Sequence, residues 1–185
     1  MCPGEFGVSV ATMKRILIFL LAASVAGCET GGEGPPPPPP TYAGPAAQEP
    51  FNEEDFAWST RKGEDAIDGQ LVYKVGRYTC QGATVVLAPE TPWSRARMRG
   101  LYLSVTSSAM PRDEVEARTP AEHSAEYQRY ARRTTCDASN RFAFEGLPDG
   151  AWYVITLATT ASGGPRMAVM RRVVTRPGRT RIALP

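Results

Sequence analysis

Histidine is almost absent from this sequence, because His123 is the single one among 185 residues. A Ser-His-acid arrangement would need it, and zinc sites in proteins take histidine or cysteine ligands. His123 stands beside Glu122 and Glu126 in a segment that we expect to be helical, where a solvated side chain is typical. No glycine-rich phosphate loop comes after a predicted strand either. The sequence therefore predicts no enzyme activity, no cofactor and no metal site.

Long hydrophobic runs are also absent. The main apolar run occupies residues 16–23 and is too short to cross a bilayer as a helix, which takes about 20 residues. It comes after Lys14 and Arg15 and precedes small residues, which is the pattern of a secretory signal. We therefore expect the chain to be exported. Residues 1–12 add nothing to this signal, so the start of translation is either Met1 or Met13.

The signal ends in residues 25–28, Val-Ala-Gly-Cys, which resemble a bacterial lipobox. In that pattern the small residues leave the backbone accessible to a peptidase, and the cysteine is lipidated and becomes the new N-terminus. The resemblance implies a signal peptide over residues 1–27 and an acyl anchor on Cys28, in which each buried methylene contributes about 0.8 kcal/mol. An ordinary secretory signal with a chance cysteine is the alternative.

The residue after Cys28 implies a location. Glu29 stands where the family pattern places an aspartate in proteins that remain at the inner membrane. The resemblance therefore implies the outer membrane, with the rest of the chain facing the periplasm or the cell surface. We expect no nucleic-acid partner there, because nucleic acid is an intracellular ligand.

A tether is predicted between the anchor and the folded part of the chain. Residues 28–50 are rich in glycine and proline, with six consecutive prolines at 35–40. Such a run forms an extended and semi-rigid polyproline helix, which holds the folded domain away from the membrane. A proline run can also be a ligand for an aromatic groove. The remaining residues, 51–185, have the length of one domain.

This domain has mostly a two-residue periodicity, which is typical of strands. Turn signals separate the apolar segments, for example Pro148-Asp149-Gly150. Several short strands with this spacing indicate an all-β sandwich. The seven predicted strands are 70–75, 85–87, 132–136, 141–145, 152–160, 167–175 and 180–184.

An insertion at about residues 94–133 interrupts the pattern. Residues 119–122 read as a capping box with Thr119 at the N-cap, which predicts a short helix as far as about Arg129. Tyr127 and Tyr130 are the side chains that would anchor this helix. Residues 101–105, earlier in the insertion, are either a strand or a packed loop.

Two segments, 82–89 (GATVVLAP) and 135–154 (TCDASNRFAFEGLPDGAWYV), resemble the carboxypeptidase regulatory-like domains of the transthyretin-like class. The resemblance implies a seven-stranded transthyretin-like, or prealbumin-like, β-sandwich over about residues 70–185, with the insertion as its variable part. Asn140 replaces the usual turn glycine, which is tolerable because asparagine visits the left-handed region. The resemblance concerns the fold and only weakly the function, because sandwiches host many activities.

Cysteine usage fits an oxidising compartment. Cys2 and Cys28 belong to the leader and the anchor, which leaves Cys80 and Cys136 as an even pair in the exported domain. Cys80 lies just before one predicted strand and Cys136 at the end of another, so a disulfide between them would close the insertion at its base. Two buried free thiols are the alternative.

Two groups of residues are candidates for binding. Arg171, Arg172 and Arg176 belong to a C-terminal stretch that is rich in arginine and has no acid. Arginine binds carboxylate and phosphate groups in a bidentate manner, so an acidic lipid or glycan is a candidate ligand; a solvated strand face is the alternative. Trp93 lies at the start of the insertion, where its ring either binds sugars or packs in the domain.

These observations favour a noncatalytic outer-membrane lipoprotein. We interpret its tethered β-sandwich as a protein-interaction or envelope-assembly module. A glycan-binding envelope lipoprotein that uses exposed aromatic side chains is the alternative interpretation.

The lipid anchor is directly testable. Mass spectrometry of the mature protein is expected to find Cys28 as the first residue, joined to lipid through a thioether. A mature chain that begins at any other residue would contradict the anchor and the location.

Overall fold

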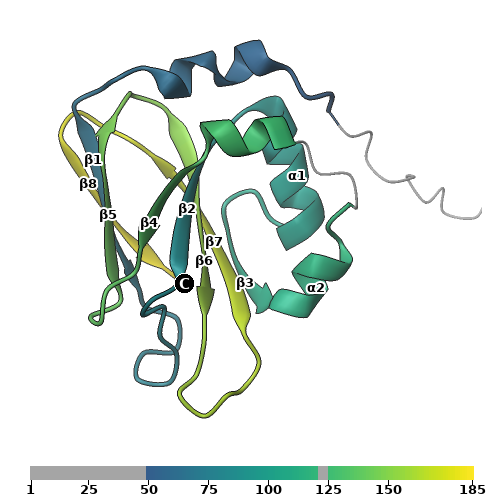
Figure 1. The fold of residues 1–185 in the computed structure, drawn as a ribbon, viewed down its shortest axis with the longest axis vertical. Coiled ribbons are helices and arrows are strands. Elements are labelled where there is room, and N and C mark those ends of the chain that lie inside the picture. The colour runs from purple at the N-terminus through teal and green to yellow at the C-terminus, as the bar shows by residue number, and fades with distance from the viewer. Residues whose placement is uncertain (1–48, 121–124) are drawn as a thin grey trace, which may run out of the picture. The chain divides into compact units, whose positions relative to one another are not determined.

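The structure, a computed structural model, describes residues 49–120 and 125–185 (Figure 1). The predicted signal, the lipidation site Cys28, nearly all of the tether and His123 lie outside these residues. The described part contains two sheets whose inner faces share one core, so the predicted all-β sandwich is confirmed. The smaller sheet has the order β5-β1-β8 and consists of Arg141–Leu147, Asp65–Leu71 and Arg179–Leu184. The larger has the order β3-β7-β6-β2-β4 and consists of Ser107–Pro111, Met167–Val174, Ala151–Ala158, Thr84–Pro89 and Arg132–Thr135.

Four short helices accompany the strands in the described residues. They are η1 (Glu53–Thr60), α1 (Pro92–Tyr102), α2 (Arg112–Ala117) and η2 (Ala125–Tyr130). Figure 1 shows α1 and α2 beside the larger sheet, on the side away from β1, β5 and β8. None of the helices that the structure describes is long and apolar enough to span a membrane.

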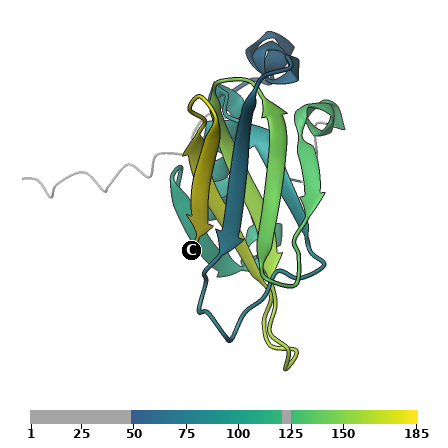
Figure 2. The ribbon, with the colours of Figure 1, turned by 90° about the vertical axis from the view of Figure 1, so that its left-hand side faces the viewer.

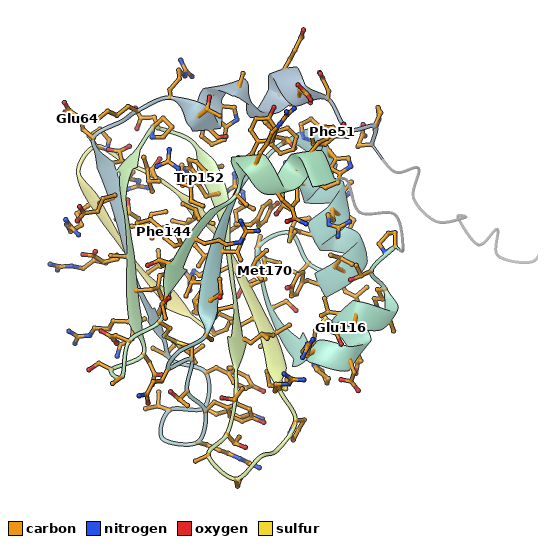
Figure 3. All side chains as sticks on the ribbon, in the orientation of Figure 1. Phe51, Glu64, Glu116, Phe144, Trp152 and Met170 are labelled. Atoms are coloured by element: carbon orange, nitrogen blue, oxygen red, sulfur yellow. A yellow bond between two sulfur atoms is a disulfide. The ribbon has the colours of Figure 1, made fainter. Side chains whose placement is uncertain are left out.

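The central strands β6 and β7 are buried on both faces. Trp152, Val154 and Val169 point into the core between the sheets. Tyr153 and Met170 point the other way, into a second apolar cluster with α1 and α2. Figure 3 shows Phe144 and Trp152 among the strands and Met170 on the side of the helices. This double burial explains why both strands read as long apolar runs, since a strand covered on both sides has no polar face.

The first predicted strand is misplaced. β1 covers Asp65–Leu71 rather than residues 70–75. Residues 70–75 do not continue as a strand: Lys74 and Gly76 adopt positive φ angles of 42° and 80°, a region that strand residues do not occupy. The alternation after Leu71 comes from a loop in which the rings of Tyr73 and Tyr78 pack edge to face, 4.9 Å apart.

A glycine in β1 is required by the packing of the sandwich. Gly69 pairs with Phe142 on β5 and with Ile182 on β8. A Cβ atom on Gly69 would lie 1.9 Å from the Phe142 ring. The ring therefore occupies the place of a side chain, and β1 has low strand propensity at the position where the core needs a glycine. This helps to explain why the sequence pattern does not mark this strand.

Residues 103–105 of the segment that was predicted as a strand or a packed loop lie in a loop, while Leu101 and Tyr102 belong to helix α1. The helix begins after Thr91, whose side chain accepts from the Ser94 backbone N–H while the Ser94 hydroxyl accepts from the Thr91 backbone N–H. This is a capping box with serine in place of the usual glutamate, which is why the sequence signal was missed. Leu101 and Tyr102 are buried against the sheet, and Leu103, with φ of 54°, ends the helix.

The rest of the insertion contributes an edge strand, β3, so the described residues form eight strands and not seven. The Thr119 hydroxyl donates to the Val115 carbonyl of α2 at 2.8 Å. Residues 121–124, which include the first turn of the predicted helix, lie outside the described residues. The C-terminal part of the predicted helix is present as η2, and β4 comes after it as expected.

The predicted disulfide between Cys80 and Cys136 is present, with 5.7 Å between the two Cα atoms. It joins the residues before β2 to the residue after β4. Backbone hydrogen bonds support it on both sides, from the Cys136 N–H to the Ala83 carbonyl and from the Gly82 N–H to the Cys136 carbonyl. The bond therefore closes the whole insertion at its base.

Removal of this disulfide is expected to destabilise the domain. The cysteines are 56 residues apart, and closing a loop of that length is worth about 4 kcal/mol in the chain-entropy model. Urea unfolding of the oxidised protein and of the Cys80→Ala/Cys136→Ala variant measures the difference. Equal unfolding free energies would contradict a stabilising role of the disulfide. Two free thiols in denatured protein from the periplasm would contradict the disulfide itself.

Candidate functional site

An open groove of about 690 Å³ lies on the outer face of the smaller sheet. β1, β5 and β8 form it, together with Thr135 at the end of β4 and Asp137 in the turn after that strand. Figure 2 shows this face toward the viewer, with no helix of the described residues in front of it. The polar side chains that line the groove are Asp68, Gln70, Thr135, Asp137, Arg141 and Arg181.

The register of the strands brings these side chains together. On one side of β1, Gln70 is opposite Arg141 of β5. On the other side, Asp68 is opposite Arg181 of β8. Because Gly69 pairs with the buried Phe142, the alternation of the strand directs Asp68 and Gln70 outward. Arg141 and Arg181 therefore flank β1 on the same face.

Both carboxylates that line the groove, those of Asp68 and Asp137, accept hydrogen bonds from other groups of the protein. Asp68 accepts from Arg179 at 2.6 Å, and Arg179 also donates to Glu145 at 2.9 Å. These hydrogen bonds, first that of Glu145 and then that of Asp68, raise the pKa of the Arg179 guanidinium. The Asp137 Oδ1 accepts from the backbone N–H groups of Ser139 and Arg141, each at 2.8 Å.

The two groove arginines, in contrast, have no acceptor for their guanidinium groups among the described residues. Arg141 and Arg181 are exposed, and the hydrogen bonds of Arg141 are made by its backbone. A guanidinium offers five donors in a fixed plane, while the Gln70 amide and the Thr135 hydroxyl each both donate and accept. The groove can therefore bind a polar ligand by several directional hydrogen bonds.

The predicted arginine surface does not form, because neighbouring residues of a strand face opposite ways. Arg171 donates to the Ala183 carbonyl of β8 at 2.6 Å. Arg172 donates to Glu90 at the end of β2, on the other face, also at 2.6 Å. Arg176 is exposed in the turn between β7 and β8. The structure therefore separates the three residues, and Arg171 and Arg172 have internal partners.

Glu90 is the centre of a network that holds Arg172. Its side chain is only 10% exposed, and it contacts Arg95 of α1 at 3.2 Å as well as Arg172. The Tyr153 hydroxyl donates to Glu90 at 3.2 Å. Burial, and then the charge of Glu90, raise the pKa of Tyr153 to about 12, so this hydroxyl stays a donor at neutral pH. The network ties α1 to the larger sheet.

Trp93, the other predicted binding residue, is half-buried in an aromatic cluster. Its ring lies 5.5 Å from Phe51 and 5.0 Å from Tyr127, and the Arg97 guanidinium lies 5.4 Å from its centroid. Phe56 completes the cluster. Burial raises the pKa of Tyr127 to about 12. These contacts join η1 and η2 to α1, which gives the ring a packing role.

Sequence reasoning did not select the residues of the groove. Arg181 stood out only as one of many arginines, and Gln70 and Arg141 only as members of alternating strands. Most outward positions of β1, β5 and β8 are polar in the sequence, which is a signal for a solvated face. Nothing local in the sequence shows that these three strands are neighbours.

A metal centre has no ligand set in the described part of the chain. Within residues 49–120 and 125–185, no three histidine, cysteine, aspartate or glutamate side chains lie close enough together to hold a metal ion.

Comparison with known proteins finds a similar fold. No protein-family profile and no curated protein matches this chain. A crystal structure from Pseudomonas aeruginosa, of a protein provisionally described as carbohydrate-binding, is similar with a TM-score of 0.54 and 19% sequence identity. The match covers 74% of this chain and 98% of that chain. At this identity the likeness concerns the fold alone.

Arg172 of β7 and Arg176 of the turn after it are expected to contribute differently to the free energy of unfolding. Arg172→Ala removes one partner of the largely buried Glu90 and should lower the free energy of unfolding by about 2 kcal/mol. The loss is smaller than for a fully buried ion pair because Arg172 is partly exposed. Arg176→Ala, at an exposed turn position, should stay within about 0.5 kcal/mol. Urea unfolding measures both. An equal loss in the two variants would contradict the structural role of Arg172.

Proposed function

We propose that this protein is a noncatalytic glycan-binding module that is tethered to the bacterial outer membrane through Cys28. The observation that carries the proposal is the open groove on the smaller sheet, lined by polar side chains from four strands and a turn. The lipobox resemblance and the proline-rich tether support the location.

The chemistry of the groove favours a ligand that is rich in hydroxyl groups. Sites for small molecules have volumes of roughly 300–1,000 Å³ and are mostly apolar, with a few polar groups. This groove has a volume in that range, but polar side chains prevail in it. An apolar ligand would leave these donors and acceptors without partners, at a cost in free energy. A saccharide can satisfy them along its whole length.

The position of the groove on strands supports the same conclusion. Side chains on paired strands are held more precisely than side chains on loops. Gln70 and Asp68 are fixed on the central strand of the smaller sheet, between two hydrogen-bonded neighbours. The provisional description of the similar Pseudomonas aeruginosa protein as carbohydrate-binding agrees with the proposal, although a shared fold is weak support for a shared function.

A protein partner, which the sequence favoured, has less support. The cores of protein interfaces are apolar and rich in aromatic side chains. The large apolar side chains that are exposed in the described residues come from separate segments, namely the loop after β1, the end of α1 and the end of β7: Val72, Val75, Leu103 and Val174. They do not supply the apolar centre that a stable protein interface needs.

A substitution that fills the groove with a large side chain tests the proposal. Ala143 is exposed on β5 opposite Asp68 and lines the groove. In Ala143→Trp the new ring should fill the groove and weaken glycan binding about tenfold or more, while an aromatic residue suits an exposed strand position. Retention of the full chain on immobilised dextran, polygalacturonate and peptidoglycan measures this. Val174→Trp, which adds the same ring to an exposed position of the other sheet, is the control.

The proposal fails if the wild-type protein is retained on none of the three polymers, or if Ala143→Trp binds as tightly as Val174→Trp. Loss of binding in Trp93→Ala but not in Ala143→Trp would move the site to the aromatic cluster and overturn the groove. Crosslinking that recovers one stoichiometric protein partner, with no glycan retained, would support the protein-interaction module instead.

A further inference from the structure

We infer that the groove selects anionic glycans, and that Arg141 and Arg181 recognise their carboxylate or sulfate groups. This inference rests on the proposed glycan-binding function and adds the charge class of the ligand. The acids and the arginines of the groove differ in whether the protein supplies them with hydrogen-bond partners. Two acids and two arginines line the groove, but the described part of the protein supplies partners to the acids and not to the two guanidinium groups.

The acids are satisfied from within the protein. Arg179 binds Asp68 and Glu145 together, which neutralises much of the negative charge at that end of the sheet. Asp137 is held by two backbone N–H groups within its own turn. Hydrogen bonds of this charge-assisted kind are short and strong. A cationic ligand would therefore have to compete with existing partners for both carboxylates.

Arg141 and Arg181 differ from several other arginines of the sandwich, which have acceptors within the protein. Arg132 donates to the carbonyls of Ser59 and Gly146, both at 3.1 Å, and Arg171 and Arg172 also have internal acceptors. Among the described residues, the cationic hydrogen-bond donors that remain unpartnered in the groove are therefore the guanidinium groups of Arg141 and Arg181. A guanidinium binds a carboxylate or sulfate with two parallel hydrogen bonds, which lysine cannot do.

The spacing of the two arginines suits an extended ligand. Arg141 lies beside Gln70 and Arg181 lies beside Asp68, so β1 runs between them with an offset of two residues. Strand spacing and rise place their Cα atoms roughly 12 Å apart. An oligosaccharide that crosses β1 would meet both guanidinium groups, and Gln70 lies between them to bind hydroxyl groups. A chain with repeated acidic groups then gains from two contacts at once.

Binding of three polymers by the full chain tests the inference. The polymers are polygalacturonate, which carries carboxylates, dextran sulfate and uncharged dextran. The charged polymers are expected to bind about tenfold or more tightly than dextran, and Arg141→Gln and Arg181→Gln should each weaken that binding about tenfold. Added salt should weaken the binding of the charged polymers and not that of dextran. Stronger binding of polygalacturonate or of dextran sulfate decides which anionic group is preferred.

Two further variants separate charge in the groove from charge in general. Arg99→Gln removes an exposed arginine that lies in the last turn of α1, and it should leave the affinity unchanged. Arg141→Lys keeps the charge but removes the planar fork, so it should restore only part of the affinity lost in Arg141→Gln. Equal effects of Arg99→Gln and Arg141→Gln would overturn the role of the groove arginines.

The possible failures can be told apart. Dextran binding as tight as polygalacturonate binding, unaffected by the arginine variants, overturns this inference and leaves the glycan-binding function intact. Retention on none of the polymers overturns both. Binding to vesicles that contain phosphatidylglycerol, with no polymer retained and with loss in both arginine variants, would overturn the inference in favour of an acidic lipid surface.

Discussion

The burial of β6 and β7 on both faces is the constraint on which the rest of the structure depends. One face forms the core with β1, β5 and β8, and the other face requires a cover, which α1 and α2 supply. Without that cover, Tyr153 and Met170 would expose large apolar surfaces to water. The insertion is therefore part of the fold, and the disulfide at its base holds both of its ends against the same sheet.

The same constraint decides which face is available for binding. The helices cover the outer side of the larger sheet, so its arginine Arg172 is used to pair Glu90 near α1. The smaller sheet has no such cover in the part of the chain that the structure describes, and most of its outward side chains are polar. A sandwich with one protected and one open outer face offers its groove on the open side. The proposed function and the charge class of its ligand both derive from that asymmetry.

The strands that sequence periodicity found are those with strong local signals. Phe142 and Phe144 alternate with polar residues in β5, and β6 and β7 are long apolar runs that end in clear turns. The strand that it misplaced, β1, has a glycine where the Phe142 ring needs space and two aspartates on its length. Helix α1 was missed because Ser94 replaces the usual capping glutamate. For β1, the tertiary packing outweighs a weak local preference.

The sequence by itself determined which residues of β5 face inward, because strand geometry alternates with a period of two. It also identified the cysteine pair, because an exported domain with two cysteines favours a bridge. Only the tertiary structure decided which outward residues meet. Gln70, Arg141 and Arg181 are far apart in the sequence, and they share one groove because β1 lies between β5 and β8. Strand order depends on how the whole core is filled, and no local pattern encodes it.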